Sequence, residues 1–305
     1  MFRRQGIKAL AFLAPSLAGL ALFNIVPVLA SLALSFTDWS GISRVRLFHG
    51  FITFVSDKFV GLKNYQTLLS DPEFWTVLGH NCYFIVLYLP LVLALSLAVS
   101  LIIQRKSHAS KIYRIIYYIP VLTSWVAGAL IWKWMLSPEY GPINNALKAI
   151  GITGPLWLQS ETWAMPSIVL ASVWKDMGFY GMILLSGLLS INPDYYEAAN
   201  IDGAGPIRKF FGITLPLLSP ILFYVIMLSL INAFQLFPQV MVMTKSGEAG
   251  PNGVTMVMVE RIYKYAFKFG RMGYATAWSW ALFVIIFAFT ALQNVLQKRW
   301  VHYES

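Results

Sequence analysis

The polar side chains best placed to act on a solute lie inside long apolar stretches. Lys175 and Asp176 are adjacent near the middle of one of them, 164–190. A charge at the centre of a bilayer costs about 2.5–3.5 kcal/mol even on insertion scales, so each is expected to point into a helix bundle or a water-filled cavity. Neighbouring residues do not face each other on a helix. Two roles stay open, a pathway or gating role and a structural pair with another helix.

Three amides form the second group. Asn232, Gln235 and Gln239 follow an i, i+3, i+7 spacing, which places them on one face of a helix. Amides pair with hydroxyl groups and aromatic rings pack on sugar C–H surfaces, so this pattern is typical of a path for a neutral polyol or sugar. The alternative is hydrogen bonding between membrane helices. The tentative translocation pathway comprises Asn232, Phe234, Gln235, Gln239, Lys175 and Asp176.

The composition identifies the elements that must hold these groups. The chain has 305 residues, of which 58% are hydrophobic and only 12% charged, about half the charged share of a soluble domain. Because only helices or closed barrels satisfy the backbone in lipid, and no alternating pattern occurs, we predict an all-α integral membrane protein. Six stretches reach the length of about 20 residues that a spanning helix needs: 9–36, 75–103, 114–136, 164–190, 215–243 and 274–297.

Signatures of catalysis and of metal binding are missing from the sequence. There is no Gly-Lys dipeptide and therefore no P-loop, and neither His-Glu-x-x-His nor Gly-x-Ser-x-Gly occurs. The net charge of +10 is scattered in short clusters, which argues against nucleic acid. A proton-coupled carrier would need a relay of intramembrane acids, and only Asp176 qualifies. These absences predict no catalytic or metal-binding residues and argue against a self-powered carrier.

Lysine and arginine counts bear on the orientation of the spans. With a cytoplasmic N-terminus, the inner segments hold 11 of these residues and the outer segments 10. The inner segments are shorter, so their charge density is higher, which favours this orientation. Six spans then place both termini in the cytoplasm. The amphipathic part of the outer segment 244–273 is either an interfacial helix or a docking surface for an extracytoplasmic partner.

One connection, 191–220, differs from the others. It reads INPDYYEAANIDGAGPIRKFFGITLPLLSP and is too long for a tight turn between spans. Asn192-Pro193 can start a helix, the Gly203 to Pro206 region breaks it, and 207–211 makes a second short helix. The exposed apolar residues would be a liability without a covering protein; they are Tyr195, Tyr196, Ile201, Phe210 and Phe211. A cytoplasmic protein partner is therefore expected.

This connection also carries a family pattern. The pattern is Glu197-Ala198-Ala199, then three residues, Gly203, nine residues and Ile213-x-Leu215-Pro216. Its spacing resembles that of the EAA loop of ABC-importer permeases. Further likeness extends over roughly 75–297. The chain is similar to the six-helix sugar-permease branch of the binding-protein-dependent (type I, MetI-like) family, with relatives in the maltose and glycerol-3-phosphate systems.

The resemblance implies a coupling helix between the fourth and fifth spans, seated in a separate ATPase. It implies this set of ATPase-coupling residues: Glu197, Ala198, Ala199, Asp202, Gly203, Ala204, Ile213, Leu215 and Pro216. Implied partners are a second homologous permease subunit in a heterodimer, two ATP-binding subunits and an extracytoplasmic solute-binding protein. ATP and Mg would bind to the ATPase, and this chain would hold no cofactor. The location would be the bacterial cell membrane.

The domains expected are 1–74 (first helix and first outer loop), 75–297 (importer domain, EAA loop 191–216) and a cytoplasmic tail, 298–305. The function expected is half of a pathway for a carbohydrate, specifically an oligosaccharide. The alternative is a permease for glycerol-3-phosphate, phosphodiesters or anionic sugars, which Lys133 and Lys175 would serve. Another class, a membrane-embedded enzyme or stand-alone carrier, would be excluded by an adjacent reading frame for a P-loop ATPase.

Overall fold

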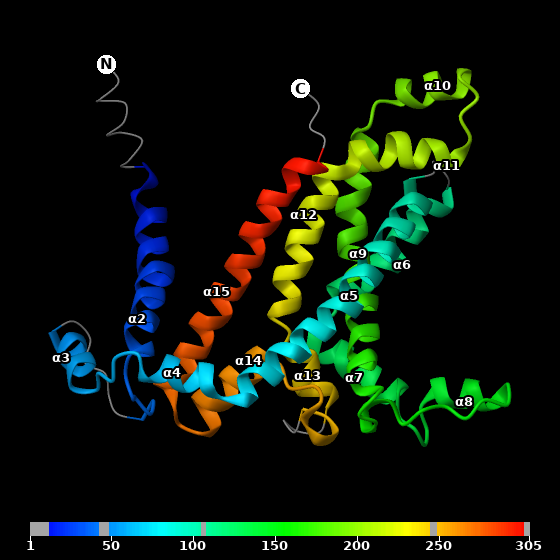
Figure 1. Ribbon diagram of the computed structural model, residues 1–305. Coiled ribbons are helices and arrows are strands. Elements are labelled where there is room, and N and C mark those ends of the chain that lie inside the picture. The colour runs from blue at the N-terminus through cyan, green and yellow to red at the C-terminus, as the bar shows by residue number, and fades with distance from the viewer. Residues whose placement is uncertain (1–11, 43–48, 105–107, 245–248, 302–305) are drawn as a thin grey trace, which may run out of the picture. The chain divides into compact units, whose positions relative to one another are not determined.

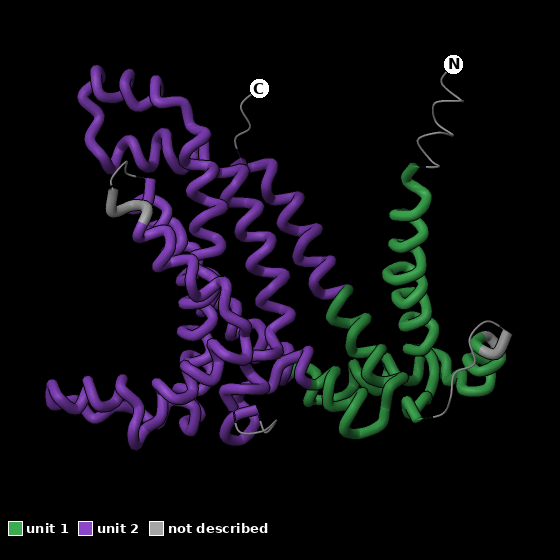
Figure 2. Tube along the Cα trace, turned by 180° about the vertical axis from the view of Figure 1, so that it is seen from behind, with its two compact units in different colours: residues 1–75, 261–283 green, residues 76–260, 284–305 purple. Residues whose placement is uncertain are grey.

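The computed structural model describes residues 12–42, 49–104, 108–244 and 249–301. Helices dominate these segments, and the one β-bridge among them joins Thr37 to Phe59. The chain divides into two compact units, residues 1–75 with 261–283 and residues 76–260 with 284–305 (Figure 2). The prediction of an all-helical membrane protein is confirmed.

Five helices of the described segments are long and apolar enough to span a membrane. They are Phe12–Ser35, with η1 Ala21–Ile25 and α2 Val26–Ser35; α5 Pro72–Gln104; α9 Ala164–Ser190; Pro206–Phe234, with α11 Pro206–Lys209, η3 Phe210–Thr214 and α12 Leu215–Phe234; and Met272–Arg299, with α15 Met272–Leu296 and η6 Gln297–Arg299. A sixth candidate consists of the end of α6 His108–Leu122 and α7 Trp125–Met135, which meet at 100°.

The shorter elements lie in the connections. They are α3 His49–Asp57, α4 Lys63–Ser70, α8 Pro142–Ala149, η2 Trp157–Gln159, α10 Pro193–Ile201, α13 Pro238–Met243, η4 Pro251–Gly253, α14 Met258–Tyr263 and η5 Lys264–Lys268. Within residues 76–260, α10 and α11 lie at one end of the helices and α8 and α13 at the other (Figure 1).

The third predicted span, 114–136, is therefore not one straight helix. Helix α6 ends two residues after Pro120, and Ser124 adopts an extended conformation before α7. The Ser124 hydroxyl accepts a hydrogen bond from the Ala127 amide at 3.2 Å, which caps the new helix as serine commonly does. A local cap thus makes the sharp bend possible within an apolar stretch.

The fifth span differs from its predicted bounds, 215–243, at both ends. The continuous helix starts earlier, at Pro206, and ends at Phe234. Phe237 has φ −150° and ψ −62°, outside the helical range, before α13 begins at Pro238. Pro238 has no backbone N–H that could bond to the carbonyl of Phe234, four residues earlier, which accounts for the break. The three amides consequently do not lie on one continuous helix face, and that part of the prediction was wrong.

Helix α9 is the most buried span of residues 76–260. Small residues let it approach its neighbours closely: a Cβ at Gly187 would lie 2.7 Å from the Leu218 side chain of α12, and one at Gly178 would collide with the Tyr117 carbonyl of α6. Close approach at glycine is the usual means of packing helices in lipid. These two contacts fix the position of α9 against α6 and α12.

The unit of residues 1–75 and 261–283 has its own polar and aromatic core. Arg261 pairs with Glu73 at 3.1 Å, and the Tyr265 hydroxyl donates to the same carboxylate at 2.6 Å. Burial, reinforced by Glu73, raises the pKa of Tyr265 well above its ordinary value. Phe74 and Trp278 pack edge to face at 5.2 Å beside them. These contacts join the start of α5 to the segment that precedes and begins α15.

Candidate functional site

A cavity of about 300 Å³ lies among the helices of the larger unit. Its walls come from α5, α7, α9, the end of α12 and α13. The lining residues are Phe84, Tyr88, Trp125, Ser172, Asp176, Asn232, Ala233, Gln235, Pro238 and Gln239. Four of the six predicted pathway residues are in this set, although α12 ends between the first and last of the amides.

Both interruptions of the spans border this cavity. Trp125 is the first residue of α7, directly after the α6–α7 bend, and Gln235 is the C-cap residue that follows α12 at the second break. Irregular backbone at membrane depth is tolerated where it lines an aqueous cavity or is buried in protein. The breaks therefore shape the cavity and also bring its polar groups together.

Asp176 is held toward the cavity by an aromatic partner. The Tyr88 hydroxyl donates a hydrogen bond to Asp176 Oδ2 at 2.7 Å, and the Tyr88 ring stacks on Phe84 with centroids 5.1 Å apart. Nearby, Asn232 donates to the hydroxyl of the buried Tyr180 at 3.0 Å. Two tyrosines thus orient an acid and an amide from different helices.

Lys175 points elsewhere, as expected for the neighbour of Asp176 on a helix. Its ammonium donates to the carbonyls of Pro120, Val121 and Thr123 at 3.0, 3.4 and 2.7 Å, and it lies 5.2 Å from the Trp125 ring centroid. These carbonyls lie in the last turn of α6 and, for Thr123, just beyond it, where a cation is favoured. Lys175 is absent from the cavity lining and stabilises the bend.

Phe234, the remaining predicted pathway residue, also lies outside the lining. It is fully buried and packs on Phe289 at 5.2 Å between centroids. Its carbonyl accepts a hydrogen bond from Asn81 at 3.4 Å, and Asn81 also accepts from the Met258 amide at 2.9 Å. These contacts support the end of α12, and the sequence analysis missed Asn81.

Two buried polar atoms in the lining are unpaired. Ser172 is 1% exposed and Gln239 7% exposed. Within the described parts of the chain, neither Ser172 Oγ nor Gln239 Oε1 has a hydrogen-bond partner. A buried oxygen without a partner costs about 1–3 kcal/mol, so water or a solute is expected to satisfy both.

The sequence analysis also missed the lining residues Phe84, Tyr88, Trp125 and Ser172. Ser172 could have been noticed as a polar residue of the fourth span. The aromatic residues carry no such signal, because membrane helices contain many. Only the packing of α5 and α7 against α9 distinguishes them.

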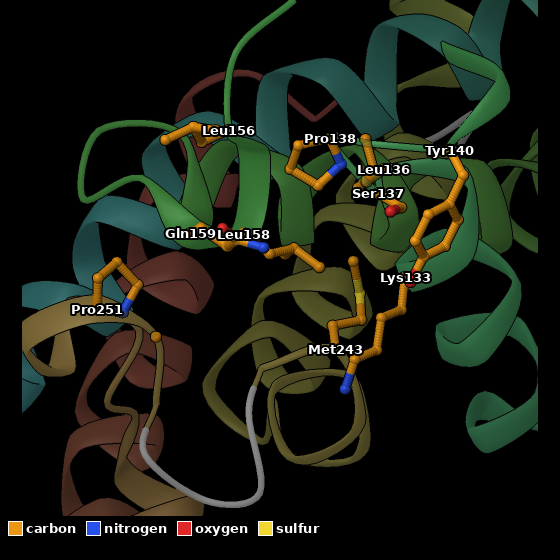
Figure 3. A pocket seen from close by; sticks show the side chains of 11 residues that line it. Lys133, Leu136, Ser137, Pro138, Tyr140, Leu156, Leu158, Gln159, Met243 and Pro251 are labelled. Carbon is orange, nitrogen blue, oxygen red and sulfur yellow. The ribbon is translucent and has the colours of Figure 1, made fainter. Parts of the chain in front are cut away.

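A second cavity, of about 500 Å³, lies at the opposite end of α7 from the bend. Figure 3 shows its lining. The Lys133 side chain extends past Met243, and on the other side of the cavity lie Leu158 and Gln159. The Lys133 ammonium donates to the Val242 carbonyl at 3.2 Å. The two lysines that could serve an anion are therefore separated, and neither lines the cavity with the amides.

The segment 191–216 forms a distinct surface. Asn192 caps α10 by accepting from the Asp194 amide at 3.1 Å, and α10 folds back alongside α11 (Figure 1). The reversal occurs at Gly203, whose φ of +69° is costly for any residue with a Cβ. The second short helix is not separate, because α11 runs through η3 into α12.

The predicted coupling residues gather on this surface. Glu197, Ala198, Asp202 and Gly203 are exposed, whereas Ala199, Ala204, Ile213, Leu215 and Pro216 are half-buried. An open hollow of about 370 Å³ is lined by Ala199, Asp202, Ala204, Arg208, Lys209, Gly212 and Ile213. Motif residues from both sides of the turn therefore border one hollow.

The expected exposure of apolar residues holds for three of the five. Tyr195, Ile201 and Phe211 are exposed, Ile201 by 88%. Phe210 is half-buried, and so is Tyr196, whose hydroxyl lies 3.0 Å from Thr214 Oγ1. Tyr196 therefore anchors α10 to the start of the long helix.

Comparison with known proteins defines the class. The model of the family "Binding-protein-dependent transport system inner membrane component" matches residues 90–302. The chain belongs to this family and is a multi-pass permease subunit of the cell membrane, a transport component.

Individual relatives are similar over nearly their whole length. The probable ABC transporter permease YesP of Bacillus subtilis is 33% identical over 99% of this chain and 94% of its own. The trehalose/maltose system permease MalF of Thermococcus litoralis is 34% identical over 90% and 88%. The lactose system permease LacF of Rhizobium radiobacter is 30% identical over 95% and 94%.

Solved structures share the fold. A bacterial alginate ABC transporter in complex with a pentasaccharide-bound periplasmic protein matches with a TM-score of 0.81, covering 97% of this chain and 96% of its own. A second alginate importer matches with a TM-score of 0.80. At 22% identity each, these likenesses show the architecture alone.

Proposed function

We propose that this chain forms half of the transmembrane pathway of an ATP-driven importer for a carbohydrate, specifically an oligosaccharide. The observation that carries the proposal is the cavity at the two helix breaks. Its amides, unpaired oxygens and aromatic rings suit a hydroxyl-rich solute. The names of the relatives from the trehalose/maltose and lactose systems support the same class of cargo.

The surface of 191–216 is the proposed site of coupling to a separate ATPase. Its exposed Glu197 is free to pair with a cation of that subunit, and Ala198 is small enough for close approach. ATP and Mg would bind to the ATPase and not to this chain. Exposed Ile201 and Phe211 give the partner an apolar contact.

This assignment orients the chain. Trp300 packs on Phe223 with centroids 6.1 Å apart and, with Leu215 and Pro216, borders a small hollow at the start of α12. The chain near its C-terminus therefore lies at the same end as the coupling surface, which we propose is cytoplasmic. Six spans then place the N-terminus there too, although residues 1–11 and 302–305 lie outside the described residues.

The full importer would also contain a second, homologous permease subunit, two ATP-binding subunits and an extracytoplasmic solute-binding protein. The family description, which names dependence on a binding protein, supports the last of these. We retain 75–297 as the importer domain, with 1–74 and 298–305 as flanking segments; the family match from residue 90 supports it.

Uptake by the assembled importer tests the proposal. Membrane vesicles that contain all subunits and the loaded binding protein would be assayed for accumulation of radiolabelled neutral oligosaccharides, with ATP or a non-hydrolysable analogue. ATP-dependent accumulation of at least one oligosaccharide is expected. Accumulation of glycerol-3-phosphate or a uronic acid alone would instead favour the alternative cargo.

A further inference from the structure

One acid dominates the electrostatics of the cavity at the helix breaks. Among the residues that line it, Asp176 is the only one with a side chain that ordinarily carries a full charge. It forms no salt bridge within the described residues. Its hydrogen-bond donor, Tyr88, is neutral at ordinary pH, so the charge is oriented but not cancelled.

The two lysines nearest to the cavity do not form an ion pair with this carboxylate. Lys175, the next residue in sequence, is held by three backbone carbonyls of the α6–α7 bend. Lys133 lines the second cavity and donates to the Val242 carbonyl. Lys175 is close enough to attract Asp176 electrostatically, but its hydrogen bonds go to the bend and not to the carboxylate.

The lining contains oxygens that can accept hydrogen bonds from a solute, beside its amide and indole donors. Gln239 Oε1 and Ser172 Oγ are buried and have no partner in the described chain, and the Asp176 carboxylate accepts only. A sugar hydroxyl can donate to each of these oxygens. A phosphate or carboxylate cannot, and it would also be repelled by Asp176 in a site with a lower dielectric than water.

We propose that Asp176 determines specificity in this cavity, by admitting neutral hydroxyl-rich solutes and rejecting anionic ones. The inference rests on the proposed function and separates its two candidate cargoes. Neutral oligosaccharides would pass, and glycerol phosphates and acidic sugars would be excluded at this point of the pathway, whatever the binding protein delivers.

Charged thiol reagents measure the cavity's potential without knowledge of the solute. Cys82 is the chain's single cysteine, so Cys82→Ser provides a background into which Gln235→Cys places one thiol in the lining. Vesicles with the complete importer would be treated with a cationic (trimethylammonium-ethyl) or an anionic (sulfonatoethyl) methanethiosulfonate. The ratio of the two modification rates, divided by the same ratio for 2-mercaptoethanol, reports the local charge.

We expect the cationic reagent to be favoured by about tenfold after this correction, because a carboxylate without an ion-pair partner lies in the same small cavity. Asp176→Asn, which keeps the shape and the contact with Tyr88, should bring the corrected ratio to within about twofold of one. Gln159→Cys in the second cavity is the matched control, and there Asp176→Asn should not alter the ratio.

Equal corrected rates at position 235, or a preference that survives Asp176→Asn, would overturn the inference. Failure of both reagents to react would overturn it too, since a cavity closed to small solutes cannot select among them. Uptake by vesicles that contain the importer with the unaltered chain tests the proposed function separately. A charge preference without carbohydrate accumulation would disprove the cargo class alone, and accumulation without a charge preference would disprove only the role of Asp176.

Discussion

The surface of 191–216 and the cavity at the helix breaks are both built from short helices and turns, but they differ in how they are encoded. The surface is one continuous segment whose motif residues lie within 20 positions, Glu197 to Pro216. The cavity combines residues from Phe84 to Gln239 on separate helices. Local turn chemistry is sufficient to form the first, whereas the second exists only when α9 packs against α5, α7, α12 and α13.

The two regions should therefore respond differently to mutation. Changes in the loop should affect coupling to a partner and leave the membrane fold intact. Changes at the cavity should alter transport of the solute when the side chain faces the cavity. They should lower the stability of the fold when the side chain bonds to a broken helix end.

The largest effect is expected at the turn of the loop. Gly203→Pro imposes a negative φ where the structure needs +69°, and Glu197→Lys reverses an exposed charge. Both should abolish uptake while the protein remains inserted, as measured by vesicle uptake and membrane fractionation. Glu139→Lys, the same charge change at an exposed position outside the loop, is the control. Normal uptake by both loop variants would remove the coupling role.

The next largest effect is expected at Lys175. Lys175→Met removes the ammonium that bonds to three carbonyls at the bend, and charged hydrogen bonds each contribute about 1.5–3 kcal/mol. The thermal melting temperature of the purified subunit should fall clearly. Asp176→Asn, one position away, should melt close to wild type. If the two variants melted alike, the structural role of Lys175 would be refuted.

Intermediate effects are expected at the amides. Asn232→Leu or Gln235→Leu removes hydrogen-bonding groups from the lining, each worth about 0.5–1.5 kcal/mol. Uptake efficiency, kcat/KM, should fall by about three- to tenfold, while the ATPase still co-purifies with the subunit. If uptake kinetics were unchanged in both variants, the proposed contact of these amides with the solute would be refuted, and only a role in packing would remain.

The smallest effect is expected where α10 meets the long helix. Tyr196→Phe removes one hydrogen bond to Thr214, worth about 1 kcal/mol, and should lower uptake only a few-fold. Thr214→Val should have a similar effect, and the double variant should be no worse than either alone. Additive losses would show that the two side chains act separately.

Much of the fold was predictable from the sequence. Long apolar runs must become helices in lipid, so the spans near 75–103, 164–190 and 274–297 agree with the structure to within a few residues. Which prolines would break a span could not be decided from the sequence. Pro120 and Pro238 are visible in the sequence, but prolines also occur in membrane helices that stay continuous, such as α5 with Pro90.

The candidate site divides in the same way. Spacing alone predicted a special role for the loop and for Asp176, Asn232, Gln235 and Gln239, because polar groups in apolar runs are costly unless they are used. Only the tertiary structure decided that Asp176 faces the cavity and that Lys175 faces the bend. Adjacent residues on a helix point in different directions, and the helices packed around α9 determine what each side chain contacts. Nor could spacing reveal Tyr88, which joins the site through a hydrogen bond across 88 positions.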